Sequence, residues 1–387
     1  MKEPHDDLPR SPRRRQLLTT ATVGAAAAAL GSTLPAAAAT RASPGANNVS
    51  VPADGKYATV PLRKETLRVT AVQSMMRAPR DTRNAAADLK ANVDHMIELI
   101  DYANGFPGPQ DLVCFHEQPI MGWNPWTLEE ALRVAIEVPG IETEALGRKA
   151  KQYGCYISFG TYARDKDWPG HLLLNGVLIA PDGNVVANHW KTNNSRGFLP
   201  NWDMFTTSIY DVLDRYREMY GEDAVLPIAR TDIGNISCSI TPGQVDVMRA
   251  HAMKGLEIRL SSSSGGYSLE DAQMISRYNR IWTVVCNQSI SPQHPGFPEY
   301  AGSGDTAIFS PDGRIASRAK SFNEEFVTAT IPIAQFRQTR AIPDVPIEML
   351  MPVYSKYVPR HGPNLQASYV PKDSQDASRH VRSKRNW

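Results

Sequence analysis

Short apolar runs alternate with helix-like segments along most of the chain. Residues 67–73 (LRVTAVQ) are rich in β-branched side chains and predict a strand. Residues 82–104 carry apolar positions at three- and four-residue spacing, which predicts a helix with one buried face. Residues 111–117 and 155–162 predict the next two strands, with a helix at 142–154 between them. This alternation is typical of a layered α/β architecture.

The same alternation returns in the second half of the chain. Apolar runs at residues 172–180 and 185–190 flank the turn sequence PDGN and predict a β-hairpin. Residues 305–310 and 314–319 predict a second hairpin around PDGR, so we expect two similar halves of one domain. Further strands are predicted at 233–240, 256–262 and 282–289, and further helices at 211–220, 244–255 and 269–281.

The first 42 residues have a different pattern. A basic stretch ends at Arg14 and Arg15, an Ala/Leu/Val-rich stretch begins at about Leu17, and an A-x-A cleavage pattern lies at residues 37–39. The RRQLL sequence resembles a twin-arginine export signal. An uncleaved membrane anchor is the alternative. We expect residues 1–42 to be removed as a signal peptide, and the protein to be exported to the periplasm or the outside of the cell.

Composition divides the remaining chain into three parts. Residues 43–65 are rich in Ser, Pro, Gly and Asn and are expected to form a loose leader. Residues 66–340 contain the alternating pattern and are expected to form one domain. From about residue 341 the chain becomes Pro-rich and polar, so residues 341–387 cannot bury much of themselves. We expect this C-terminal extension to pack on the body or on a partner subunit.

Charge and composition restrict the partner. The 387 residues carry a formal net charge of +2, and 42% of them are hydrophobic, enough for one large core or two modest ones. The basic residues are scattered, which gives no footprint for a nucleic acid. His116, His171 and His189 show no paired metal-ligand spacing. We therefore expect a small-molecule partner, no nucleic acid, and no membrane contact once the signal is removed.

One of the four cysteines differs from the others in its surroundings. Cys114, Cys155 and Cys286 lie within apolar, β-rich runs, where a free cysteine behaves as a small hydrophobe. Two disulfides are the alternative in an exported chain. Cys238 ends the apolar run of GNISCSITPG and is followed at once by turn-forming residues. It is either a small core residue or a nucleophile presented at the end of a strand.

Three polar residues, Glu117, Lys191 and Cys238, come at the ends of predicted strands. Because the carboxyl ends of strands in α/β folds converge on a ligand-binding crevice, these side chains can meet there. A carboxylate can accept the thiol proton, and a nearby ammonium group can neutralise a developing oxyanion. The thiolate can then attack a carbonyl or nitrile carbon.

The order of these motifs resembles the nitrilase superfamily, the carbon-nitrogen hydrolases. The resemblance spans about residues 66–333 and includes RVTAVQ, DLVCFHE, NGVLIAPDGNVVANHWK and IGNISC. It implies a four-layer αββα sandwich with two similar halves. It also implies that Glu117 is the general base, that Lys191 stabilises the tetrahedral intermediate and that Cys238 is the nucleophile. The backbone N–H of Ser239 would complete the oxyanion site.

The resemblance has further implications for the site. The family often has a second glutamate between its lysine and cysteine, for which Glu218 is the candidate and Glu222 the reserve. The family needs no cofactor or metal, and its members usually form homodimers or larger assemblies.

The turn at residues 261–266 (SSSSGG) follows a predicted strand and is expected near the site. Candidates for the substrate pocket are Trp123, Asn194 and Tyr267, with core packing the alternative for Trp123.

The segment after Cys238 departs from the family pattern. The family usually has an acid there, and then a Phe-Pro-Glu run that begins the next helix. Here the acid is absent, Pro242 comes early and Gln244 lies near the expected glutamate. A small amide or carbamoyl compound is the expected substrate, and a nitrile is the second choice. An exported binding protein that has lost turnover is the alternative outside the enzymes.

Overall fold

The computed structural model of the protein describes residues 49–52, 54–106, 108–197, 199–241, 244–265, 267–291 and 303–387. The expected signal peptide therefore lies outside the described residues.

Two six-stranded sheets form the centre of the described chain. The first sheet has the order β12-β1-β2-β3-β4-β5, and the second has the order β11-β10-β9-β8-β7-β6. The strands of the first sheet are β1 (Leu67–Gln73), β2 (Leu112–Cys114), β3 (Tyr156–Ala163), β4 (Leu173–Ile179), β5 (Val185–Trp190) and β12 (Glu325–Ile331). Those of the second are β6 (Ala229–Thr231), β7 (Gly234–Ser237), β8 (Ile258–Ser262), β9 (Trp282–Cys286), β10 (Ala307–Phe309) and β11 (Ile315–Arg318).

The two sheets repeat one topology. In the first sheet β1, β2 and β3 are parallel, and the hairpin β4–β5 extends them antiparallel. In the second sheet β7, β8 and β9 are parallel, and the hairpin β10–β11 extends them in the same way. Each parallel trio has one antiparallel neighbour on its other side, β12 or β6. The expectation of two similar halves is confirmed.

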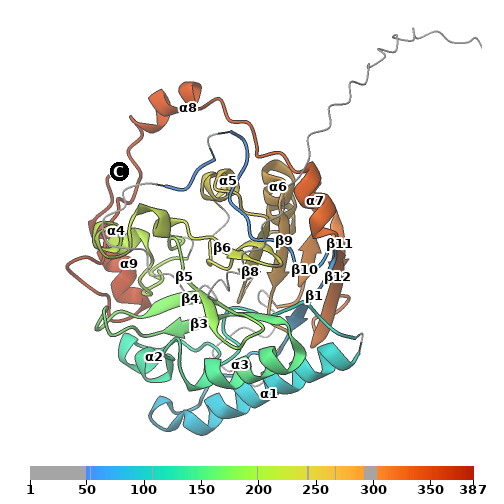
Figure 1. Ribbon diagram of the computed structural model, residues 1–387. Coiled ribbons are helices and arrows are strands. Elements are labelled where there is room, and N and C mark those ends of the chain that lie inside the picture. The colour runs from blue at the N-terminus through green and yellow to red at the C-terminus, as the bar shows by residue number, and fades with distance from the viewer. Residues whose placement is uncertain are drawn as a thin grey trace, which may run out of the picture. The chain divides into compact units, whose positions relative to one another are not determined.

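Helices cover the outer faces of both sheets (Figure 1). The helices α1 and α3 pack on the first sheet through residues such as Met96 and Leu146, and α5 and α6 cover the second. The result is the expected four-layer αββα sandwich. The α-helices are α1 (Ala86–Gly105), α2 (Leu128–Val134), α3 (Ile141–Tyr153), α4 (Leu213–Tyr220), α5 (Val245–Met253), α6 (Leu269–Asn279), α7 (Ile333–Thr339), α8 (Ile347–Tyr354) and α9 (Ser374–Ser383). The short 3-10 helices are η1 (Thr82–Asn84), η2 (Tyr210–Val212) and η3 (Glu222–Val225).

The space between the sheets is a continuous apolar core. Alternate residues of β1 and β8, such as Val69 and Leu260, point into it because successive side chains of a strand face opposite ways. Cys114, Cys238 and Cys286 belong to this core. All four cysteines are buried free thiols, which confirms the expectation of unpaired cysteines.

The two terminal segments outside the sandwich contact it at defined points. The Tyr57 hydroxyl donates to the buried Glu257 carboxylate at 2.9 Å, although a loose leader was expected over residues 43–65. In the C-terminal extension, α9 buries Ala377 and Val381, whereas α8 buries no residue. No helix in the described part of the chain is long and apolar enough to span a membrane.

Candidate active site

Glu117 lies three residues beyond the end of β2, at the carboxyl edge of the first sheet. Its backbone N–H donates to the carbonyl of Ser263, in the loop after β8, at 3.2 Å. A Cβ on Gly160 would lie 2.5 Å from the carbonyl oxygen of Glu117, so β3 must carry a glycine opposite it. These contacts hold Glu117 between the two sheets, where it is only 8% exposed.

The carboxylate of Glu117 is surrounded by protein. Burial raises its pKa, because a charged carboxylate loses its hydration there, while Lys191 and a hydrogen bond from Ser264 oppose the rise. The Ser264 hydroxyl donates this bond to Glu117 Oε2. Ser264 belongs to the SSSSGG turn, so the turn lies beside Glu117 as expected.

Lys191 directly follows β5 and is 6% exposed. Its N–H donates to the Leu174 carbonyl at 2.8 Å, and its Nζ lies 3.2 Å from the Met204 sulfur. Burial lowers the pKa of the ammonium group, and the nearby Glu117 charge opposes that effect. The charge of each of these two residues therefore opposes the effect of burial on the pKa of the other.

Asp211 is a buried acid that lies between Lys191 and Cys238 in the sequence, and its charge raises the pKa of Lys191. Asp211 is 2% exposed, pairs with Arg196 at 2.5 Å and accepts a hydrogen bond from the Ser208 hydroxyl at 2.6 Å. The sequence pattern did not indicate it, because a single aspartate in a long insert has no local motif.

The two glutamates expected to assist Lys191 lie elsewhere. Glu218 is exposed on α4, and no hydrogen bond or ion pair of its side chain is found among the described residues. Glu222 pairs with Arg217 at 3.0 Å. Neither one acts on the charge of Lys191, whose charged neighbours are Glu117, Arg196 and Asp211.

Cys238 lies one residue beyond β7 and is 1% exposed. Its sulfur donates to the carbonyl of Gly176 on β4 at 3.1 Å, and its N–H donates to Nδ1 of His189 at 3.4 Å. A Cβ on Gly176 would lie 1.7 Å from the carbonyl oxygen of Cys238. Only glycine at position 176 lets the two sheets approach this closely.

The thiol of Cys238 is strongly desolvated. Burial raises its pKa to about 12, although backbone amides of His189 and Cys238 itself oppose the rise. In the described part of the chain, no hydrogen bond joins this sulfur to Glu117 or Lys191. The structure thus brings the acid and the amine together, and turns the sulfur towards β4.

The loop after Cys238 is bound to both neighbours of Lys191. The Ser239 hydroxyl donates to the Trp190 carbonyl at 2.6 Å, and the Thr192 N–H donates to the Ile240 carbonyl at 3.2 Å. The Ser239 N–H, the expected oxyanion donor, makes a long hydrogen bond of 3.4 Å to Ser237 Oγ. The segment that follows Cys238 is therefore bound to the backbone on either side of Lys191.

The three pocket candidates have different surroundings. Trp123 is half-buried. Burial and the Glu117 charge raise the pKa of Tyr162, and a hydrogen bond with Trp123 lowers it. The amide of Asn194 donates to the carbonyl of Thr206 and to the Asp211 carboxylate, so it braces the loop after β5. The hydroxyl of Tyr267 donates to the Asp305 carbonyl. Of the three candidates, Trp123 is the one linked to Glu117, because both residues affect the pKa of Tyr162.

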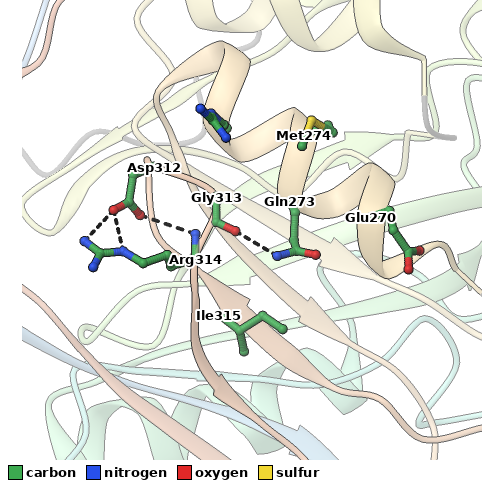
Figure 2. Close-up of a pocket in the computed structure, with 8 residues that line it drawn as sticks. Glu270, Gln273, Met274, Asp312, Gly313, Arg314 and Ile315 are labelled. Carbon is green, nitrogen blue, oxygen red and sulfur yellow. Dashed lines mark hydrogen bonds and ion pairs between the residues drawn. The ribbon is translucent and has the colours of Figure 1, made fainter. Parts of the chain in front are cut away.

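A surface hollow lies between α6 and the β10–β11 hairpin (Figure 2). Two pairs of its lining residues are hydrogen-bonded: Gln273 donates to the Gly313 carbonyl at 3.1 Å, and Asp312 accepts from Arg314 at 2.6 Å. None of the candidate site residues lines it. Among the described residues, no group of three or more His, Cys, Asp or Glu side chains is arranged to hold a metal ion.

Known proteins match this chain over most of the sandwich. Residues 68–341 match the family model described as carbon-nitrogen hydrolase. The chain is 23% identical over 226 residues to the bifunctional nitrilase/nitrile hydratase NIT4A of Nicotiana tabacum, which covers 53% of this chain and 59% of that protein. It is 21% identical over 262 residues to the glutamine-dependent NAD(+) synthetase of Aquifex aeolicus, covering 66% and 42%. The chain thus spans little more than half the length of the first of these relatives.

Solved structures share the fold. A double mutant of an amidase from Nesterenkonia sp. AN1, solved in complex with acrylamide, superposes with a TM-score of 0.51 at 15% identity and covers 76% of this chain and 100% of that one. Nit3 of Saccharomyces cerevisiae superposes with a TM-score of 0.54 at 15% identity, covering 73% and 96%. At this level of identity, the likeness concerns the fold.

Proposed function

Because the chain belongs to the carbon-nitrogen hydrolase family, we propose that it hydrolyses a non-peptide C–N bond in a small amide or carbamoyl compound. The observation that carries the proposal is the pair of buried residues Glu117 and Lys191, in which the charge of each affects the pKa of the other. The loop after Cys238 is bound to the residues on either side of Lys191, which supports a role for the thiol in the same site. A double mutant of an amidase with the same fold was solved in complex with acrylamide.

The proposed reaction has two stages. Glu117 accepts the thiol proton as Cys238 Sγ bonds to the carbonyl carbon, and Lys191 with the Ser239 N–H stabilises the resulting oxyanion. The C–N bond then breaks, and the leaving nitrogen takes the proton from Glu117. Water, deprotonated by Glu117, attacks the thioester and releases the acid and the free thiol. Each well-placed oxyanion donor lowers the barrier by about 3 kcal/mol.

Burial determines how the proton must move. With its pKa raised to about 12, the Cys238 thiol holds very little free thiolate at neutral pH. Proton transfer to Glu117 therefore has to accompany the attack, and the raised pKa of Glu117 makes it a stronger base. The sulfur must also leave its hydrogen bond to the Gly176 carbonyl before it can reach a substrate.

Two other functions have specific support. The names of the tobacco relatives favour a nitrile as the second substrate class. The orientation of the Cys238 sulfur, towards Gly176, favours a binding protein that keeps the sandwich without turnover. The departure of the segment after Cys238 from the family pattern supports the same alternative.

Trapping of the acyl intermediate separates these functions. The protein is incubated with a panel of amides, carbamoyl compounds and nitriles, ammonia is measured, and Cys238 peptides are analysed by mass spectrometry. Ammonia release with an acyl adduct on Cys238, both lost in C238A and kept in C155S, supports the hydrolase. Cys155 is the matched control because it is a buried thiol outside the site. Saturable ligand binding without ammonia or adduct would support the binding protein.

We also propose that the protein is exported by the twin-arginine route to the periplasm or beyond. The support is the RRQLL sequence followed by an apolar stretch and small residues. Replacement of Arg14 and Arg15 by lysine should retain the full-length protein in the cytoplasm, as measured by cell fractionation. The R10K variant, a basic change outside the pair, is the control. Unchanged export of the double variant would overturn the proposal.

We further propose that the protein forms a homodimer or a larger homo-oligomer. The support is α8, an apolar helix with no buried residue, in which Met349 is 76% exposed and Val353 is 66% exposed. A second copy of the chain would cover such a surface.

A further inference from the structure

Met204 supplies the hydrogen-bond partner of the Lys191 ammonium group. The Nζ of Lys191 donates to the Met204 sulfur at 3.2 Å. Within the part of the chain that the structure describes, this Nζ makes no ion pair and no second hydrogen bond. An ammonium group has three N–H donors, and a thioether sulfur is a neutral and weak acceptor. The described residues therefore give this buried cation one weak partner.

The backbone around Met204 is fixed from two sides. The carbonyl of Met204 accepts from Nη1 of Arg196 at 3.0 Å, and Arg196 in turn pairs with the buried Asp211. The N–H of Asp203 donates to the Ser374 carbonyl at 3.1 Å. The side chain of Met204 also packs against the apolar cluster of the first sheet and its helices. The sulfur is therefore held in a defined place.

The segment that carries Met204 folds back over the ends of β4 and β5. The N–H of Thr207 donates to the Leu172 carbonyl, just before β4, at 2.8 Å. The N–H of Ile209 donates to the carbonyl of Lys191 itself at 3.0 Å. The contact between sulfur and ammonium is therefore supported by backbone hydrogen bonds of the same loop.

A neutral partner suits a cation that has to stabilise an oxyanion. The ammonium group must be oriented, because a misplaced group loses much of its effect on the barrier. A carboxylate in the place of the sulfur would also orient it. That carboxylate would compete with the oxyanion for the positive charge, and more strongly in a buried site than in water. A thioether orients the ammonium group with little competition.

We propose that Met204 is a positioning residue, whose sulfur holds the Lys191 ammonium group in the orientation in which it meets the substrate oxygen. This inference rests on the proposed function, because it deepens the role of Lys191 in the same site. Met204 acts through Lys191, and the bond-breaking steps belong to the residues described above.

The contact should also affect the protonation of Lys191. A hydrogen bond accepted from an ammonium group favours its charged form, so without the acceptor Lys191 should lose its proton at lower pH. The other charged groups that act on Lys191 are Glu117 and Asp211, which raise its pKa, and Arg196, which lowers it. All three remain in variants at position 204. A shift in the protonation of Lys191 therefore reports the loss or gain of the acceptor.

The test compares M204L, M204Q and the wild type across pH, with the compound of the panel above that the wild type hydrolyses fastest. Lys191 must keep its proton, so kcat/KM falls as the pH rises through its pKa. This basic limb should move to lower pH in M204L, by roughly half a unit, and to higher pH in M204Q, whose amide oxygen is a stronger acceptor. At neutral pH kcat of M204L should fall roughly tenfold, with KM changed less than about twofold.

The matched control is M219L, the same change at a partly buried methionine of α4 that packs in a separate apolar cluster. Its basic limb and kcat should equal those of the wild type. A basic limb that is the same in M204L, M204Q and the wild type would overturn the inference and leave the proposed hydrolase in place. A loss of kcat in M204L no greater than in M219L would also overturn it.

A variant that fails to fold does not leave the inference untested. If M204L does not fold, M204Q decides: a basic limb at higher pH than in the wild type supports the inference, and an unmoved limb overturns it. Failure of the wild type to hydrolyse any compound of the panel would instead contradict the proposed function.

Discussion

Burial sets the chemistry of single residues in this site. Glu117 and Lys191 are both more than nine-tenths buried, and burial shifts their pKa values towards each other. The Ser264 hydroxyl works against this shift in Glu117, because its hydrogen bond favours the charged carboxylate. A small change at position 264 should therefore alter the pH dependence of the reaction.

The S264A variant should lose activity at a higher pH than the wild type. The general base must be ionised, so kcat/KM falls as the pH drops through the pKa of Glu117. Loss of the hydrogen bond raises that pKa further, by roughly one unit for a bond to a charged group. The pH profile of kcat/KM measures the shift. The control is S263A, because the Ser263 hydroxyl donates to the Gly265 carbonyl, and its acid limb should match that of the wild type. An unshifted acid limb in S264A would contradict the assignment of Glu117 as the general base.

The G176A variant should be strongly destabilised, because its Cβ would lie 1.7 Å from the Cys238 carbonyl oxygen. Backbone atoms cannot give way as a flexible side chain can, so we expect a loss of roughly 1–3 kcal/mol or more in the free energy of unfolding. Urea unfolding measures the loss. The control is G105A, where nothing lies within 4 Å of the added Cβ. A loss no greater than that of G105A would contradict the close approach of the sheets.

At the scale of elements, the C-terminal extension supports the loop after β5. Gln366 is 2% exposed, its N–H donates to the Asp211 carbonyl at 2.9 Å, and its side chain accepts from the Thr207 hydroxyl at 2.6 Å. The loop also carries Met204, the contact of Lys191. Segments far apart in the sequence therefore cooperate to hold Lys191 in place.

The Q366A variant should lose both stability and activity. Truncation leaves the buried Thr207 hydroxyl without its acceptor, which costs about 1–3 kcal/mol in the free energy of unfolding. The freed loop should lower kcat more than it raises KM, since Lys191 acts in the transition state. Thermal unfolding and steady-state kinetics measure these effects. S383A, which loses an exposed hydrogen bond at the end of α9, is the control, and equal effects in the two variants would contradict the supporting role.

At the scale of the whole molecule, exposed apolar surface is concentrated in α8. Introduction of charge there, as in M349D/V353D, should convert the proposed oligomer to monomers, because a buried unpaired carboxylate is costly. Light scattering of the full chain measures the mass. The control is Y102D, which places one new carboxylate at a residue that is 67% exposed on α1. A monomeric wild type, or an oligomer that survives M349D/V353D, would contradict self-association through α8.

The repeated strand pattern was sufficient to predict a layered α/β domain with two similar halves, whereas the four-layer sandwich was implied by the resemblance to the nitrilase superfamily. Runs such as residues 67–73 and 282–289 alternate with amphipathic helices. Such elements can be predicted because the spacing of apolar residues along a short segment differs between strands and helices. The short β6 and α2 were missed, because three and seven residues give too little periodicity. The capping box of Thr127 and Glu130 was the signal that could have revealed α2.

The candidate site could be predicted only in part. Glu117, Lys191 and Cys238 each follow a strand, a local feature that the sequence displays. Asp211 could not be recognised, since an isolated charge becomes informative only when its burial and partners are known. For the same reason Glu218 could be chosen as an assisting acid although it lies exposed on α4.

The sequence alone determined the order of most strands and helices, the two hairpins and the strand ends at which polar residues stand. These properties depend on neighbours a few positions apart, which the chain specifies directly. The tertiary structure decided which charges are buried and paired, and that the Cys238 sulfur faces Gly176. Such properties arise between residues distant in the chain, because desolvation and pairing depend on what the fold places around each group.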